Sequence, residues 1–346
     1  MLCAGCDKRD ARFTQTRMQR NDGTCRRPRG FPGKAYCAAM KRVAVLRLFR
    51  LARAGLLGAT LLLAACQGAL FAGLNATDER VGVRHFDDIE FDARRHLSLD
   101  VYAPEHAQGA PVVVFFYGGS WLGGERGWFR FVGDALAAHG VVVAIPDYRK
   151  LPEVDLDGFM RDAARAVAWT RTHAADYGGD ARRLFVMGHS SGGHIAALLA
   201  TDPQWLARYG LVPRDLAGCI GLAGVYAFLP ADVDDDEMLD VFGATPNERR
   251  EAAPVAFVRG REPPMLLLSG DADHEVDAEN SRELATALRA KGEPVELRIY
   301  PGIGHSALLL ALSSPLRSHA PTLRDVLAFV GAGAHAHAQT APTSPR

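Results

Sequence analysis

The decisive stretch of this 346-residue chain reads LFVMGHSSGG, residues 184–193. Its first four residues form an apolar run typical of a buried strand, and the small residues after Gly193 favour a helix. Between them stands the pattern Gly188-x-Ser190-x-Gly192. Such glycines let the backbone turn back sharply, which lifts the serine hydroxyl above the sheet at the N-terminus of a helix. We therefore expect Ser190 to be a nucleophile, at a helix end whose dipole favours developing negative charge.

Strand-like and helix-like segments alternate on both sides of this turn. Apolar, β-branched runs predict buried strands, and helical spacing predicts helices between them. The predicted strands are residues 112–117, 141–145, 184–187, 220–223, 265–268 and 295–300, and the predicted helices are residues 129–139, 158–173, 193–200, 278–291 and 321–330. This alternation predicts an α/β fold with a mostly parallel central sheet and helices on both faces. Sites in such sheets lie at the carboxyl ends of the strands.

A second glycine-rich turn follows the first of these predicted strands. It reads YGGSW, residues 117–121, and consecutive glycines allow the backbone to approach a substrate closely. The tetrahedral intermediates of acyl transfer need N–H donors aimed at their oxyanion. We expect the N–H groups of Gly118, Gly119 and Ser191 to form this oxyanion hole beside Ser190.

An acid and a base are expected after two later strands. Residues 269–276 read SGDADHEV, and His305 closes the glycine-flanked segment PGIGH. Ser, then Asp, then His is one of the known chain orders of a catalytic triad. In a triad His305 takes the serine proton, while the acid orients the imidazole and stabilises its charged form. Asp273 is preferred as the acid, and Asp271 remains the alternative because spacing does not separate them.

Three other histidines stand close to these motifs in the sequence. They are His189 inside the serine turn, His194 on the predicted helix after it, and His274 beside the preferred acid. None has both the chain order and the loop setting of a catalytic base. We expect structural or pocket-lining roles for all three.

The segment before residue 67 has the pattern of a bacterial secretion signal. Basic residues without acidic ones, from Met40 onward, precede an apolar run at residues 54–65 that is too short to span a membrane. The run ends LAAC, which resembles a lipobox, whose cysteine carries lipid and becomes the mature N-terminus. We expect Cys66 to be lipid-modified, with a plain secretory signal as the alternative. The resemblance implies an extracytoplasmic protein anchored to a bacterial membrane, and Gln67 favours the outer membrane.

These features divide the chain into five parts. Residues 1–39 show no hydrophobic periodicity and are interpreted as a mis-assigned extension, with translation starting at Met40. Their Cys-x-x-Cys pair lacks the partner that structural zinc requires, so a metal site is not expected there. The remaining parts are a signal peptide at 40–65, an anchor and linker at 66–80, a catalytic domain at 81–333 and a disordered tail at 334–346.

The charge distribution excludes one class of partner. The 40 basic and 40 acidic residues balance overall, but residues 1–65 hold 14 basic residues and three acidic ones. The rest of the chain therefore carries 26 basic and 37 acidic residues. An acidic body repels phosphate backbones, so we expect no nucleic-acid binding. Membrane contact is expected only through the lipid anchor.

Five segments occur in the order of a known family: YGGSW, PDYR, GHSSGG, DADHEV and PGIGH. Over about residues 90–330, the chain resembles the carboxylesterase and hormone-sensitive-lipase-like branch of the α/β-hydrolase superfamily. Within it, the chain is similar to isoprenylcysteine methylesterase-like and kynurenine formamidase-like proteins. The resemblance implies an α/β-hydrolase fold with a small lid region. It also implies a triad of Ser190, Asp273 and His305, and no cofactor or metal.

The chain departs from that family in two places. Many members have His-Gly-Gly-Gly where this chain has YGGS, so we expect the Tyr117 and Ser120 side chains to reshape the pocket rim. The expected lid, residues 226–262, contains an acidic run at 232–240. We interpret this run as a solvated loop rather than as a calcium site, because its ligand spacing is poor.

The motifs favour a carboxylic-ester hydrolase that acts through an acyl-enzyme intermediate on small to medium esters. A formamidase or amidase of the kynurenine formamidase kind would use the same residues. An acetyl- or feruloyl-esterase acting on plant polysaccharide would suit an anchored extracytoplasmic protein. A catalytically silent binding protein is the alternative outside enzymes. The expected partner is a small-molecule ester, and the oligomeric state is not readable from the sequence.

Overall fold

The computed structural model describes residues 68–77, 81–227, 242–243 and 245–338. These residues belong to one unit, Cys66–Arg346. The expected extension, the signal peptide, the lipidation site Cys66 and the acidic run at 232–240 lie outside the described residues.

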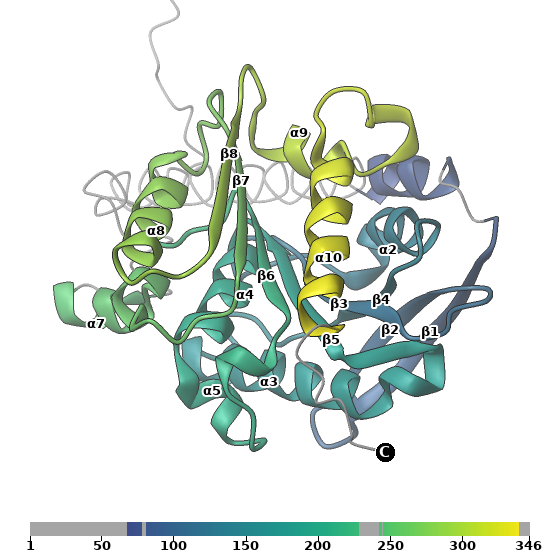
Figure 1. The fold of residues 1–346 in the computed structure, drawn as a ribbon, viewed down its shortest axis with the longest axis horizontal. Coiled ribbons are helices and arrows are strands. Elements are labelled where there is room, and N and C mark those ends of the chain that lie inside the picture. The colour runs from purple at the N-terminus through teal and green to yellow at the C-terminus, as the bar shows by residue number, and fades with distance from the viewer. Residues whose placement is uncertain (1–67, 78–80, 228–241, 244, 339–346) are drawn as a thin grey trace, which may run out of the picture. The chain divides into compact units, whose positions relative to one another are not determined.

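A single eight-stranded sheet forms the centre of this unit (Figure 1). Its strands are β1 (Val83–Asp92), β2 (Leu97–Pro104), β3 (Ala110–Phe116), β4 (Val142–Pro146), β5 (Gly179–His189), β6 (Gly218–Leu222), β7 (Met265–Gly270) and β8 (Val295–Tyr300). They run in the order β1-β2-β4-β3-β5-β6-β7-β8. β1 pairs antiparallel with β2, β2 pairs antiparallel with β4, and all other pairs are parallel. The predicted, mostly parallel sheet is confirmed.

Helices cover both faces of the sheet. The α-helices are α2 (Arg130–Ala137), α3 (Leu156–His173), α4 (Ser191–Thr201), α5 (Pro203–Ala207), α7 (Pro246–Ala252), α8 (Glu279–Ala290), α9 (His305–Leu310) and α10 (Thr322–Ala338), and residues 68–76 are also helical. α2 and α10 contact each other on the face seen in front in Figure 1, whereas α3, α4 and α5 contact one another behind the sheet. Two covered faces explain why β3, β4, β6 and β7 are almost continuously apolar.

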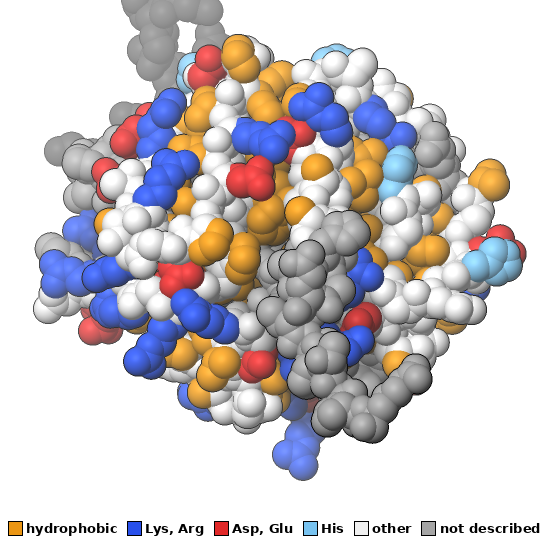
Figure 2. All heavy atoms as spheres, in the orientation of Figure 1, with side chains coloured by type: hydrophobic (Ala, Val, Ile, Leu, Met, Phe, Trp, Pro, Cys, Tyr) orange, Lys and Arg blue, Asp and Glu red, His pale blue; other side chains and the backbone are white. Residues whose placement is uncertain are grey.

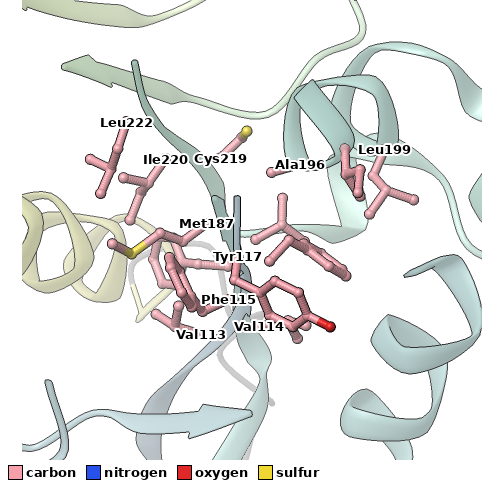
Figure 3. Close-up of a cluster of buried hydrophobic side chains, with 14 of the residues drawn as sticks. Val113, Val114, Phe115, Tyr117, Met187, Ala196, Leu199, Cys219, Ile220 and Leu222 are labelled. Atoms are coloured by element: carbon pink, nitrogen blue, oxygen red, sulfur yellow. The ribbon is translucent and has the colours of Figure 1, made fainter. Parts of the chain in front are cut away.

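Buried side chains of β3, β5, β6 and α4 form a cluster in the core (Figure 3). Met187 and Ile220 are register partners and point the same way, toward α10, whereas Cys219 points to the other face. Cys219 is fully buried and free. Burial raises the pKa of its thiol, so it behaves as a small apolar side chain. This rigid centre fixes the turn that follows β5.

Three parts of the fold differ from the predictions. β1 and β2 were not predicted, because β1 is half exposed, carries few consecutive apolar residues and has two register shifts. The expected linker at 66–80 contains the helix 68–76, whose Leu74 is buried. At the other end, α10 continues to Ala338, past the domain boundary predicted at residue 333.

The surface of this unit carries both signs of charge. In the orientation of Figure 1, Figure 2 shows Lys and Arg side chains scattered among acidic and apolar groups. Within the described ranges, no helix has the length and apolar character needed to cross a membrane.

Candidate active site

Ser190 lies in a strained turn between β5 and α4. Its backbone has φ 55° and ψ −124°, a conformation that L-residues rarely adopt. The turn is held by its neighbours, because the Ser190 N–H donates to the Leu222 carbonyl at 3.0 Å. A Cβ on Gly188 would stand 2.0 Å from the Gly192 oxygen, so the chain doubles back only because these positions lack side chains.

His305 and Asp273 form a hydrogen-bonded pair beside this turn. The His305 Nδ1 lies 2.8 Å from the Asp273 Oδ2, and both side chains are buried. Asp273 follows β7, and His305 is the first residue of α9 after Gly304. The loops after two parallel strands thus bring together residues 32 positions apart in the sequence. A carboxylate at Nδ1 leaves Nε2 as the basic nitrogen.

The other candidate acid, Asp271, has a different position. Its side chain is exposed, and its Oδ1 accepts a hydrogen bond from the Gly302 N–H at 2.6 Å. It therefore ties the loop after β7 to the loop that precedes His305, and it is not bonded to the imidazole. The geometry favours Asp273 over Asp271 as the partner of His305.

Ser190 and His305 line the same cavity, which has a volume of about 580 Å³. Among the described residues, no hydrogen bond joins the Ser190 hydroxyl to His305. The nearest charged group to the His305 Nε2 is the Glu275 Oε2, at 4.0 Å, on a side chain that is 70% exposed. Catalytic hydrogen bonds are often long before substrate binds and shorten in the complex. Ser190 and His305 therefore border one cavity, with Asp273 behind the imidazole.

The glycine-rich loop after β3 lies directly against the serine. A Cβ on Gly118 would meet the Ser190 Cβ at 3.0 Å, so glycine is needed for this approach. Gly119 has φ 144°, and Ser120 has φ 53°. Gly118, Gly119 and Ser120 all line the cavity, and Ser191 begins α4 next to Ser190. The three expected oxyanion donors thus surround one side of Ser190.

Tyr117 does not lie on the pocket rim, so that expectation is wrong. Its side chain is fully buried beneath the loop, and its hydroxyl donates to the Asp147 Oδ1 at 3.1 Å and accepts from Lys150 Nζ at 3.0 Å. The Tyr148 hydroxyl donates to the Tyr117 carbonyl at 2.8 Å. The PDYR segment therefore supports the glycine-rich loop from below. Ser120 does line the cavity, as expected.

The three other histidines have distinct surroundings. His189 is buried and donates through Nε2 to the His305 carbonyl at 3.2 Å, which helps to hold the loop of the base. His194 donates through Nε2 to the Ala252 carbonyl at 2.8 Å and packs against Trp121. Burial lowers the pKa of His189 to about 3 and that of His194 to about 4, so both are neutral near pH 7. His274 is exposed.

Several cavity residues were not anticipated from the sequence. They are apolar and come from three separate parts of the chain: Leu70, Phe71, Leu122, Trp128, Phe129, Leu309 and Leu310. No motif identifies them, because an apolar residue at a pocket wall is indistinguishable in the sequence from one in the core. Over the described ranges, no cluster of three or more His, Cys, Asp or Glu side chains could hold a metal ion.

One family model matches this chain. It is the model described as BD-FAE, and the match covers residues 99–288, which include the glycine-rich loop, the serine turn and Asp273.

Curated relatives include esterases from plants and bacteria. The isoprenylcysteine alpha-carbonyl methylesterase ICME of Arabidopsis thaliana is 29% identical over 253 residues, covering 67% of this chain and 58% of the relative. Esterase LipC of Mycobacterium tuberculosis is 32% identical over 220 residues, covering 58% of this chain and 54% of the relative. This chain thus spans little more than half the length of these two relatives.

Solved structures of esterases share the fold. An inhibited esterase B from Lactobacillus rhamnosis superposes with a TM-score of 0.69 at 21% identity, covering 82% of this chain and 98% of that one. The butyrate-bound esterase Est2 of Thermogutta terrifontis superposes with a TM-score of 0.60 at 25% identity, covering 73% of this chain and 94% of that one.

Proposed function

Because this chain belongs to the BD-FAE family and has the α/β-hydrolase fold, we propose that it is a serine esterase that hydrolyses carboxylic esters. One observation carries the proposal. His305, whose Nδ1 is hydrogen-bonded to Asp273, lines the same cavity as Ser190, which stands on a strained turn at the start of α4. A nucleophile, a base and an orienting acid at one cavity are the parts that acyl transfer requires.

The first half of the reaction forms an acyl-enzyme. His305 removes the proton from the Ser190 hydroxyl as its oxygen attacks the ester carbonyl. The N–H groups of Gly118, Gly119 and Ser191 stabilise the resulting oxyanion. When the intermediate collapses, the imidazolium returns the proton to the leaving alcohol, and the acyl group remains on the serine. Asp273 stabilises the imidazolium during both proton transfers.

The second half reverses these roles with water. His305 takes a proton from a water molecule, whose oxygen attacks the acyl carbonyl, and the same N–H donors hold the second oxyanion. Collapse releases the carboxylic acid and restores the serine hydroxyl. All proton transfers use the imidazole of His305, so the proposed reaction needs no second general acid or base.

The test is hydrolysis of a p-nitrophenyl ester series, from acetate to palmitate, together with labelling by a fluorophosphonate probe. The full chain should label and hydrolyse at least one ester, and Ser190→Ala should lose both activities. Ser318→Ala, which changes an exposed serine, is the matched control and should keep both.

Two results would contradict the proposal. Folded wild-type protein that is no faster than Ser190→Ala on every ester would refute esterase activity, and formamides would be assayed next. Failure of the folded protein to label as well would favour a binding protein on the same fold.

A further inference from the structure

The helix 68–76, drawn in purple in Figure 1, contributes Leu70 and Phe71 to the lining of the active-site cavity. The Phe71 ring stacks on the Trp128 ring, with centroids 5.3 Å apart and planes 9° from parallel. Phe71 also contacts the ring of Phe129, and Leu74 is buried. Both Trp128 and Phe129 line the cavity, so the helix forms part of its wall.

The Asn75 side chain fixes this helix in place. Its Nδ2 donates to the Gly127 carbonyl at 2.9 Å, and its Oδ1 accepts from the Phe131 N–H at 3.1 Å. The Phe131 N–H belongs to the first turn of α2, where backbone donors have no partner within the helix. One side chain therefore joins helix 68–76 to the segment that leads from the glycine-rich loop into α2.

The wall is apolar and partly open to solvent. Leu70 is 53% exposed, and Leu122, on the glycine-rich loop, is 50% exposed. Both line the cavity, together with Phe71 and Trp128. Exposed apolar side chains that surround a pocket with polar groups at its base are typical of a site that binds an apolar ligand.

We propose that helix 68–76 forms the acyl-chain wall of the active site and that Leu70 and Phe71 determine which chain lengths are accepted. This inference rests on the proposed esterase function. His305 must reach the leaving alcohol to protonate it, so the alcohol lies beside the imidazole. The acyl chain then extends from Ser190 along the part of the cavity lined by Leu122 and Trp128, where helix 68–76 contacts it.

The experiment compares Leu70→Ser with Val212→Ser in the full chain. Both positions are 53% exposed, but Val212 lies outside the active-site cavity. For each protein, kcat and KM are measured on p-nitrophenyl acetate, butyrate and octanoate. Leu70→Ser should lower the octanoate-to-acetate ratio of kcat/KM by about five- to tenfold, because one apolar contact along several methylenes is lost. Val212→Ser should leave the ratio unchanged.

A second variant and a second substrate series sharpen the test. Leu70→Trp narrows the cavity and should shift the preferred acyl chain toward shorter lengths. Alkyl acetates, in which only the alcohol grows, should respond to neither variant. The inference is overturned if acetate is hydrolysed but the acyl-length profile of both variants equals that of wild type, or if only the alkyl acetates respond. Wild type that is inactive on every ester would instead refute the esterase function.

Discussion

Burial and hydrogen bonding shift the pKa of the Asp273 carboxylate in opposite directions. Burial raises its pKa, but the hydrogen bond with His305 and those from the Val276 and Glu275 N–H groups, at 2.9 and 3.0 Å, outweigh burial. The net pKa lies below its ordinary value, so the group is charged at neutral pH. A charged acceptor at Nδ1 holds the imidazole in the tautomer whose Nε2 can accept a proton. The backbone N–H groups of the loop after β7 thus act together with His305 to keep the carboxylate charged.

Replacement of this carboxylate gives the first residue-scale prediction. Asp273→Asn should lower kcat by about 10⁴-fold with little change in fold, because the amide cannot hold the same tautomer or stabilise the imidazolium. Asp271→Asn keeps the oxygen that accepts from Gly302 and should change kcat little. Steady-state kinetics of the two variants on one p-nitrophenyl ester decide between the acids. Equal losses, or a larger loss at Asp271, would contradict the assignment.

Some residues of the site could be predicted from the sequence and others could not. Ser190 and His305 stand in short glycine-rich patterns that indicate sharp turns carrying a reactive side chain. The structure brings both residues to one cavity. The sequence does not decide between Asp271 and Asp273 as the acid. The direction in which each side chain points is set only by the folded loop. The role of His189 as a support for the His305 loop depends on a contact across 116 residues. No local pattern encodes such a contact.

At the scale of elements, the approach of the serine turn to β3 depends on Gly192. A Cβ at this position would stand 2.0 Å from the Phe116 oxygen and 2.6 Å from the Tyr117 oxygen. Both atoms belong to backbone that cannot move without shifting the loop that carries Gly118 and Gly119. The fit between α4 and β3 therefore sets the distance between the nucleophile and its expected oxyanion donors.

Gly192→Ala should push α4 away from β3. We expect it to lower the free energy of unfolding by at least about 2 kcal/mol, since overpacking against backbone forces a shift, and to reduce kcat as well. Gly331→Ala on α10 is the control, because its Cβ would meet nothing within 4 Å. It should stabilise the protein by about 0.5–1 kcal/mol through helix propensity. Urea denaturation measures both, and an equal effect of the two variants would refute this account.

The central elements were predictable from the sequence, whereas the edge elements were not. β3, β4 and β7 are buried on both faces, so each is a continuous apolar run that stands out from its surroundings. β1 has one exposed face and two register shifts, which break the alternation that marks a strand. Helix 68–76 lies in the segment predicted as a linker, and the sequence does not reveal it because its stability comes from tertiary contacts of Phe71, Leu74 and Asn75. A nine-residue helix has little intrinsic stability of its own.

At the scale of the whole molecule, two buried histidines couple folding to pH. The pKa of His189 falls to about 3 and that of His194 to about 4, from an ordinary value of 6.5, mainly because burial penalises the charged form. Between about pH 4 and 6.5, the unfolded chain therefore binds more protons than the folded protein. By linkage, stability is fully present above about pH 6.5 and is lost progressively as the pH falls through this interval.

Stability measurements at two pH values test this coupling. Lowering the pH from 7.5 to 5.0 should cost about 2 kcal/mol through His194 alone, from the size of its pKa change. His194→Gln can still donate to the Ala252 carbonyl, but it removes the titrating group, so the pH-dependent loss should shrink by that amount. His106→Gln, at an exposed position, should keep the wild-type dependence. Identical pH dependence in all three proteins, measured by urea denaturation, would contradict this role of His194.

The helix beside the cavity has one more consequence. Helix 68–76 stands two positions after Cys66, and two residues span at most about 7 Å. If Cys66 carries lipid, as the sequence predicts, the cavity-lining residues Leu70 and Phe71 would lie only a few positions from the anchor and so close to the membrane surface. Substrate capture would become a search in two dimensions, governed by the mole fraction of ester among the surrounding lipids rather than by its concentration in water. The predicted anchor and linker, residues 66–80, would then determine whether the substrate reaches the cavity from the membrane or from water.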